Sequence, residues 1–334
     1  MSQLTVIGGG FGGIAAALRA RAKGYQVTLV DRCPRLGGRA QVFEREGYRH
    51  DAGPTVITAP FLFAELFELF GKRMEDYVQL VPLDLWYRFE FRDGTRFDYG
   101  GTLDQTLDEI RRINPADVEG YRRLLNDSRN IHKVGFEMLS DAPFHRFGFM
   151  LRQVPHLLRL GAWRTVWQMV CRRLDSDYLR QAFSIQPLLV GGNPFDTTSI
   201  YGLIHFLERA HGVHFAMGGT GALVDGLEKL MTEVGIRIEL NQTVTGIDVV
   251  DNRVTGIHLK TGAGWRPISW SAMPIPRIST TTCCHQRHPG FQPVSRQDMR
   301  KSPWDSSSCS SAAVNSTRMS PTTRSGWAHA TGNC

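Results

Sequence analysis

Gly8, Gly10 and Gly13 have the spacing G-x-G-x-x-G near the start of the chain. A short apolar run at 4–7 precedes these glycines, and a helical pattern follows them. In such a strand–turn–helix unit, the first glycine makes the tight turn and the second lets a phosphate approach the backbone. The third lets helix and strand pack closely, and the helix N-terminus offers N–H groups to a diphosphate. The pattern therefore predicts a dinucleotide site, to which we also assign Gly12.

A second strand and an acidic residue complete this unit. Residues 26–30 form a strand pattern after Gly24, and Asp31 stands at the end of that strand. An acid at this place hydrogen-bonds a ribose hydroxyl of the nucleotide. Glycines alone would be a weak signal, whereas strand, glycines, helix, strand and acid in this order are a strong one.

Gly37, Gly38 and Arg39 follow the second strand after a short loop. A nicotinamide dinucleotide needs no second glycine pair here, whereas the longer ribityl chain of a flavin dinucleotide does. Arg39 would bring a fixed charge to the phosphates or the flavin edge, the alternative being a surface ion pair. The segment 51–56 gathers small, turn-forming residues suited to backbone beside a flat ring. Its assigned cofactor residues are Gly53, Pro54 and Thr55. The cofactor predicted is FAD.

At this point the chain resembles the bacterial phytoene desaturase family, the FAD-dependent carotenoid desaturases. The resemblance covers residues 1 to about 262 and lies in these stretches: 6–13, 37–40, 51–57, 114–115, 117–121, 189–195 and 218–224. It implies an α/β fold: an FAD-binding Rossmann-like domain of the glutathione-reductase type, with an inserted β-hairpin and a helical substrate and membrane domain. It also implies that Val244 lies near the adenine. Successive dehydrogenation of phytoene toward lycopene is the implied activity, and we name no catalytic base.

The organisation expected from the resemblance and the patterning has four parts. Residues 1–75 and 214–264 would form the FAD-binding domain, and 76–213 the substrate and membrane-associating domain. A hairpin is predicted across Asp93 and Gly94, a capping box at Thr102 and Gln105, and a longer helix capped by Asn114. The last part, 265–334, has no legible pattern and is either a disordered tail or translated out of frame. Its composition favours the second interpretation.

Arginine and tryptophan alternate with apolar residues over 142–174, a segment without Asp or Glu. Together with the resemblance, this pattern favours peripheral contact with a membrane, the alternative being a core helix with a basic solvated face. No apolar run is long enough to span a bilayer, and no signal peptide is evident, so we expect a cytoplasmic, membrane-associated protein. His205, His211 and His214 are expected to be structural rather than metal ligands.

Most of the formal net charge of +7 lies in the tail. Residues 265–334 carry eight Lys or Arg and two Asp or Glu, a balance of +6. The basic character therefore does not indicate a nucleic-acid partner. Cysteines show no C-x-x-C spacing, so neither a zinc site nor a redox pair is predicted.

Two alternatives remain beside the carotenoid desaturase. One is another flavin oxidoreductase of the amine oxidase kind. The other is a non-catalytic isoprenoid-binding relative of the same fold. The family resemblance also implies a glycine-rich closing segment that this sequence lacks, so we expect little or no turnover from this chain. The sequence leaves the oligomeric state, the terminal electron acceptor and the number of desaturation steps open.

Overall fold

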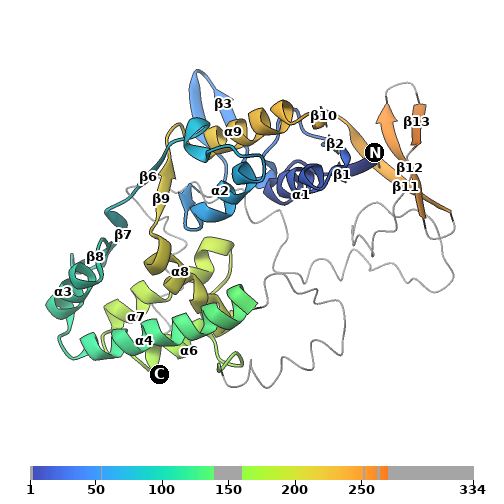
Figure 1. The fold of residues 1–334 in the computed structure, drawn as a ribbon. Coiled ribbons are helices and arrows are strands. Elements are labelled where there is room, and N and C mark those ends of the chain that lie inside the picture. Colours follow the sequence, from blue (N-terminus) through green and yellow to red (C-terminus); the bar gives the residue numbers. More distant parts are fainter. Residues whose placement is uncertain (1–2, 54, 139–159, 251–252, 262–263, 270–334) are drawn as a thin grey trace. The chain divides into compact units, whose positions relative to one another are not determined.

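The computed structural model describes residues 3–53, 55–138, 160–250, 253–261 and 264–269 (Figure 1). The chain divides into two compact units. The first comprises described residues within 1–81 and 214–293, and the second those within 82–213. The first unit returns to itself after the second has been inserted, which is the chain order expected of an interrupted nucleotide-binding domain.

A parallel sheet and its crossover helix form the centre of the first unit. Strand β1 (Gln3–Ile7) pairs with β2 (Gln26–Val30) in register from Gln3 opposite Gln26 to Ile7 opposite Val30. Helix α1 (Phe11–Ala22) connects them, and β10 (Arg237–Glu239) adds a third parallel strand beside β2. The predicted strand–turn–helix–strand unit is thus confirmed.

Alternation along β2 separates two layers that cover the sheet. Val27 and Leu29 belong to a core cluster that includes buried residues of α1, α2 (Pro60–Glu68) and α9 (Thr220–Glu233). Val30 points to the other cluster, with Ile257 and Leu259. Successive side chains of a strand face opposite sides, so helices lie on one face and an antiparallel sheet on the other. The α/β fold expected from the sequence is confirmed.

The antiparallel layer consists of three strands. They are β11 (Thr243–Val250), β12 (Arg253–Thr261) and β13 (Gly264–Ser269), hydrogen-bonded in that order. β13 includes residues 265–269 of the segment in which the sequence shows no legible pattern. Pairing of an edge strand depends on backbone hydrogen bonds and requires no apolar alternation. The rest of that segment lies outside the described residues.

Smaller elements complete the first unit. Its other elements are η1 (Gly38–Ala40), β3 (Val42–Arg45), β4 (Tyr48–Asp51), β5 (Val56–Ile57), η2 (Met74–Asp76), β6 (Leu80–Pro82) and β9 (His214–Ala216). β3 and β4 form a hairpin, and β5, β9 and β6 a small sheet in that order. The hairpin leads directly into the segment assigned to the flavin ring.

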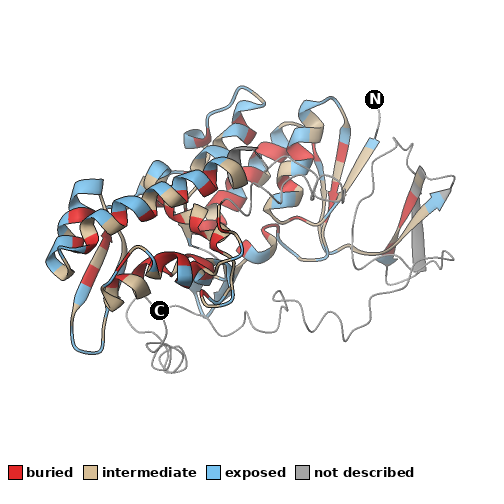
Figure 2. Ribbon diagram, turned by 90° about the horizontal axis from the view of Figure 1, so that it is seen from below, coloured by how far each residue is buried: buried red, intermediate tan, exposed pale blue. Residues whose placement is uncertain are grey.

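The second unit is a hairpin packed with helices. Its elements are β7 (Leu85–Glu90), β8 (Arg96–Gly100), α3 (Leu103–Ile113), α4 (Asp117–His132), η3 (Lys133–Met138), α6 (Val166–Cys171), α7 (Asp177–Phe183), η4 (Gln186–Val190), η5 (Ser199–Gly202) and α8 (Leu203–His211). Figure 2 shows buried residues alternating with intermediate and exposed ones along the helices. Phe97, Tyr99, Tyr121 and Phe183 form the aromatic centre of this core. The predicted hairpin and helical inserted domain is confirmed as structure.

The sequence predicted two helix caps, of which the structure confirms one. The capping box at Thr102 and Gln105 is confirmed, because each side chain accepts from the other residue's backbone N–H. The predicted cap at Asn114 was wrong, because Asn114 ends α3 and α4 starts at Asp117 after Ala116. The Asn114 amide instead donates to the Asp117 carboxylate at 3.0 Å. The Asp117 carboxylate also accepts from the backbone N–H groups of Asp175 and Ser176, contacts that the local sequence pattern could not show.

Candidate functional site

The first glycine loop presents backbone without side chains. Gly8 has φ +106°, a conformation that favours glycine. A Cβ on Gly13 would lie 1.8 Å from the Gly8 carbonyl oxygen, so a side chain there would prevent close packing of α1 on the turn. Gly10 is the N-cap residue of α1 and has no side chain to occupy the helix N-terminus. A Cβ on Gly12 would meet no described atom within 4 Å. The helix N-terminus and its partial positive charge are therefore accessible to an anionic group.

Asp31 holds this loop in place. One carboxylate oxygen accepts from the Gly9 N–H at 2.5 Å and the other from the Cys33 N–H at 2.7 Å. A carboxylate has about four acceptor sites, so acceptor sites remain beside the two that these contacts between described residues use. Sequence reasoning overlooked Gly9, whose Cβ would lie 2.4 Å from Leu36. The G-G-G run contained the signal, but only the fold shows what approaches its middle residue.

The second glycine pair lies directly against the first loop. The Gly37 N–H donates to the Gly9 carbonyl oxygen at 2.8 Å, and Gly10 and Gly37 form a parallel bridge. A Cβ on Gly38 would lie 3.0 Å from the Gly10 Cα. The structure thus brings together two glycine motifs more than twenty residues apart and forms one continuous stretch of bare backbone. Arg39 follows within η1 with an exposed side chain.

The third assigned segment follows strand β4. A Cβ on Gly53 would lie 2.1 Å from the Arg39 carbonyl oxygen, and the Ala52 N–H donates to the Gln41 carbonyl at 2.8 Å. Thr55 is exposed. Pro54 lies outside the described residues. Gly53 and Arg39 are therefore adjacent through their backbones, and both belong to the same unit as the glycine loops.

Val244 lies on β11 and packs against the cluster of Val30, Ile257 and Leu259. Val30 is the last residue of β2 and directly precedes Asp31. The expected adenine residue is therefore held close in the structure to the strand that carries the expected ribose ligand.

Asp51 has a structural role that the sequence did not reveal. Its carboxylate accepts from the backbone N–H groups of Thr220 at 2.9 Å and Gly221 at 3.4 Å, at the start of α9. The residues involved belong to two stretches that carried the family resemblance, 51–57 and 218–224. The separation of 169 residues explains why no local pattern pointed to the contact.

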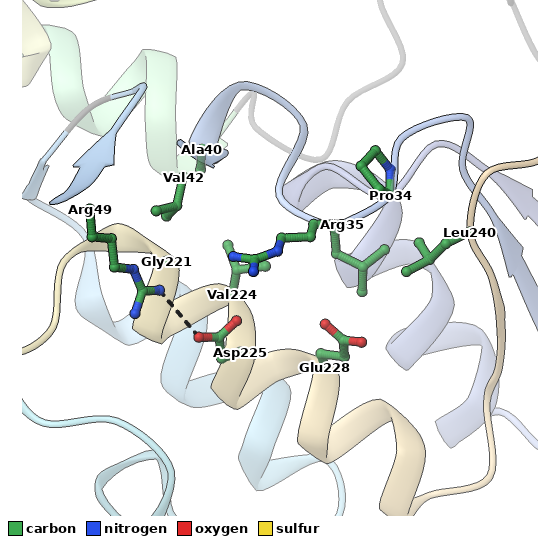
Figure 3. A pocket seen from close by; sticks show the side chains of 11 residues that line it. Pro34, Arg35, Ala40, Val42, Arg49, Gly221, Val224, Asp225, Glu228 and Leu240 are labelled. Carbon is green, nitrogen blue, oxygen red and sulfur yellow. Dashed lines mark hydrogen bonds and ion pairs between the residues drawn. The ribbon is translucent and has the colours of Figure 1, made fainter. Parts of the chain in front are cut away.

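A cavity of about 230 Å³ lies beside the second glycine pair, between the loop 34–42 and α9 (Figure 3). Arg49 and Asp225 form an ion pair at 3.4 Å across it. Burial, with the nearby Asp225 charge adding to it, raises the pKa of Glu228, which faces the same cavity. None of the predicted cofactor residues lines this cavity, whose walls combine cationic, acidic and apolar side chains.

The three histidines lie outside the glycine segments 8–13 and 37–38 in sequence. His205 belongs to an aromatic core of the second unit. Its ring Nδ1 lies 3.2 Å from the Tyr99 hydroxyl, and it packs edge-on against Tyr121 and Phe183. Burial lowers the pKa of His205 to about 3, so it is neutral at physiological pH. Within the described ranges, no three His, Cys, Asp or Glu side chains are grouped to hold a metal ion.

The arginine- and tryptophan-rich segment is described only from residue 160 onward. Trp163 is 65 % exposed and lies under the Arg164 guanidinium, 4.2 Å from the ring centre. Val166, Trp167 and Val170 are buried in the protein itself. Of the parts of the chain that the structure describes, no helix combines the length and apolar character needed to cross a bilayer.

Comparisons with known proteins agree with this geometry. The model of the family described as flavin containing amine oxidoreductase matches residues 11–264. A lycopene-forming phytoene desaturase of Pseudescherichia vulneris is 48% identical over 262 residues, which are 78% of this chain and 53% of that protein. A neurosporene-forming phytoene desaturase of Rhodobacter capsulatus is 39% identical over 263 residues, 78% of this chain and 50% of that protein. The chain thus spans about half the length of these relatives.

Solved structures show the same fold at low sequence identity. An oxidoreductase from Methanosarcina mazei gives a TM-score of 0.53 at 16% identity. The match covers 80% of this chain and 57% of the oxidoreductase chain. Putrescine oxidase bound to putrescine gives a TM-score of 0.52 at 14% identity. That match covers 80% of this chain and 57% of the putrescine oxidase chain. The comparisons confirm the predicted resemblance to bacterial phytoene desaturases and the predicted fold.

Proposed function

The chain belongs to the flavin containing amine oxidoreductase family, and on that premise we propose that it binds FAD and forms part of a carotenoid desaturase. The substrate would be phytoene or a related carotenoid, dehydrogenated in successive steps toward lycopene. The observation that carries the proposal is the contact between the two glycine loops, in which Gly37 bonds to Gly9 and Gly38 meets Gly10.

We call the two adjoining glycine loops, 8–13 and 37–38, the cradle. The cradle fits the extended diphosphate of FAD for a physical reason. Bare backbone on both loops lets a phosphate chain lie closer than any Cβ would permit. The N-terminus of α1 supplies N–H donors and a favourable dipole for its charge. Arg39 directly follows Gly38, and Gly53 lies against the Arg39 carbonyl. These two residues would extend the binding surface beyond the glycine loops, because FAD is longer than a single nucleotide. The fit thus rests on shape and on backbone donors.

We assign roles to individual residues within this proposal. Asp31 would bind a ribose hydroxyl, Val244 would contact the adenine, and Arg39 would neutralise phosphate charge or the flavin edge. Gly53, Pro54 and Thr55 would lie along the ring. Gly8, Gly10, Gly12, Gly13, Gly37 and Gly38 would line the diphosphate.

The saturated C–C bond of a polyene precursor offers no group for acid–base attack. Bound FAD supplies the hydride-accepting chemistry that such a bond requires. The chain's own residues would bind and orient that group and keep water from it, which is why no catalytic triad is needed. The substrate assignment is supported by the names of the relatives, two of which are phytoene desaturases with different end products.

A C40 hydrocarbon dissolves in lipid, so we also propose peripheral contact of the chain with a membrane surface. Among described residues, the exposed Trp163 beneath Arg164 supports this, since tryptophan and arginine both suit the headgroup region. The remaining arginines of that segment up to Arg159 lie outside the described residues.

Titration of the purified chain with FAD, followed by flavin fluorescence and visible absorbance, tests the cofactor proposal. We expect Gly12→Ala to fold normally, since alanine favours the helix and its Cβ meets no protein atom. Its FAD affinity should fall at least about tenfold, about 1.4 kcal/mol, because the methyl enters the diphosphate space. Ala16→Ser, on an exposed position of the same helix, is the matched control and should bind FAD normally.

Equal FAD affinity in Gly12→Ala and the wild type would refute the cradle. Because we expect little or no turnover from this chain, the substrate is tested by the change that phytoene in liposomes, and separately putrescine, causes in the absorbance of the bound flavin. A response to phytoene alone supports the desaturase proposal, whereas a response to putrescine alone would replace it with the amine oxidase alternative.

A further inference from the structure

Helix α9 begins without a cap from its own sequence. Its N-cap residue is Gly219, and its first turn contains no acidic residue. The backbone N–H groups of Thr220 and Gly221 donate to the Asp51 carboxylate, at 2.9 and 3.4 Å. An ionised carboxylate at a helix N-terminus satisfies N–H groups that the helix cannot, and complements the dipole. Asp51, at the end of β4, therefore does the work of an N-cap from a distant segment.

Glycines make this approach possible. A Cβ on Gly219 would lie 2.3 Å from an Asp51 carboxylate oxygen, and Gly219 has φ +82°. A Cβ on Gly221 would lie 2.4 Å from a Val42 methyl group on β3 and 2.5 Å from the Arg49 guanidinium on β4. The start of α9 is thus pressed onto the β3–β4 hairpin, and side chains at 219 and 221 would separate them.

The chain leaves Asp51 directly into the segment assigned to the flavin ring. Ala52 bonds to the Gln41 carbonyl at 2.8 Å, and Gly53 lies against the Arg39 carbonyl. Arg39, Asp51 and Gly53 are therefore tied to one another by backbone contacts within a few residues. Any shift of Asp51 relative to α9 would move Gly53 and Arg39 with it.

We propose that Asp51 is a positioning residue for FAD: by capping α9 it fixes Gly53 and Arg39 in line with the two glycine loops. This inference rests on the proposed FAD binding and deepens it, since it names a residue that acts on the cofactor only through others. Asp51 itself has its two carboxylate oxygens directed at the helix, not at the cradle. Its effect should therefore reach the cofactor as a change in backbone position.

Two substitutions and a matched control test the inference. Asp51→Ala removes both acceptors, whereas Asp51→Asn keeps one acceptor oxygen and the shape. Asp225→Asn breaks the Arg49–Asp225 pair, which joins the same strand to the same helix one turn later through exposed side chains. Each variant would be measured without FAD by hydrogen–deuterium exchange, and with FAD by titration and by the visible circular dichroism of the bound flavin.

In the FAD-free chain, we expect Asp51→Ala to speed exchange in the peptides covering 218–223 and 39–53. Its FAD affinity should fall at least tenfold with an altered flavin dichroism, Asp51→Asn should be intermediate, and Asp225→Asn should match the wild type. The inference is overturned if exchange in 39–53 is unchanged, or if exchange rises equally across the whole first unit. It is also overturned if FAD affinity and dichroism in Asp51→Ala equal those of the wild type.

The two proposals fail differently. A wild-type chain that binds no FAD refutes the proposed function, and the exchange measurements still decide whether Asp51 positions the 39–53 segment. A wild-type chain that binds FAD together with an unaffected Asp51→Ala variant refutes the positioning role alone.

Discussion

Glu208 should make the stability of the second unit depend on pH. Its side chain on α8 is fully buried, at 0% exposure. One carboxyl oxygen accepts from the Tyr87 hydroxyl at 2.8 Å, and the other has no hydrogen-bond partner among the described residues. Burial raises the pKa of Glu208 from 4.5 to about 7, although the Tyr87 hydrogen bond and the Arg209 charge lower it.

The direction of the effect follows from the raised pKa. Between 4.5 and about 7 the unfolded chain loses its proton while the folded chain keeps it. The contribution of Glu208 to folding stability is therefore largest below 4.5, decreases as the pH rises through this window, and levels off above about 7. Each pH unit between these two pKa values corresponds to about 1.36 kcal/mol. The rise of the Glu208 pKa from 4.5 to about 7 therefore lowers the free energy of unfolding by about 3 kcal/mol at high pH.

Groups around Glu208 hold their charge state over this range. Burial raises the pKa of Tyr87, Tyr99 and Tyr121, which face it from β7, β8 and α4. On α8 itself, burial keeps His205 neutral by lowering its pKa to about 3. In the folded chain, Glu208 is therefore the member of this cluster that changes charge between pH 5 and 8. His205 takes up a proton only on unfolding, and this effect is common to the wild type and Glu208→Gln, so it cancels in their difference.

Urea unfolding of the wild type and Glu208→Gln at pH 5, 6, 7 and 8 measures this effect. Glutamine keeps the shape and an acceptor for Tyr87 but cannot ionise. The variant should gain up to about 3 kcal/mol over the wild type at pH 8 and about 1 kcal/mol or less at pH 5. Glu90→Gln, which removes an exposed carboxylate from β7, is the control and should lack the gain of about 3 kcal/mol at pH 8. A constant difference between wild type and Glu208→Gln across the series would refute a neutral, buried Glu208.

Three further substitutions test packing in the second unit by thermal and urea unfolding. Gly120→Ala should cost about 1–3 kcal/mol, because its Cβ would lie 1.9 Å from the Arg173 carbonyl oxygen; a stabilised variant would contradict the close approach. Thr102→Ala should cost about 1 kcal/mol by removing the cap bonded to Gln105, and Thr102→Ser should restore most of it. Asp117→Ala should cost about 1–3 kcal/mol, since this buried carboxylate accepts two backbone N–H groups at the start of α7, and a change below 0.5 kcal/mol would show that water replaces it.

Sequence reasoning succeeded where the physical cause is local. The capping box at Thr102 is complete within four residues, and the turn at Gly8 to Gly13 is set by the strand and helix beside it. It failed at Asn114, whose amide donates to the Asp117 carboxylate, while that carboxylate is itself held by the distant N–H groups of Asp175 and Ser176. It also could not find the contact of Asp51 with Thr220, because 169 residues separate the partners and neither forms a recognisable local pattern.

The same distinction separates motifs that maintain the fold from those that form the site. Asp117 and Gly120 belong to a stretch typical of the family, yet their contacts are with backbone of the second unit. Similarity at these positions therefore reports how that unit packs and is weak evidence for catalysis. Gly12 differs, because a Cβ there would meet no protein atom within 4 Å, so no packing contact among the described residues requires a glycine at this position. An FAD titration of the Gly12→Ala variant consequently tests function more directly than any change in the second unit, where a loss of activity could follow from misfolding alone.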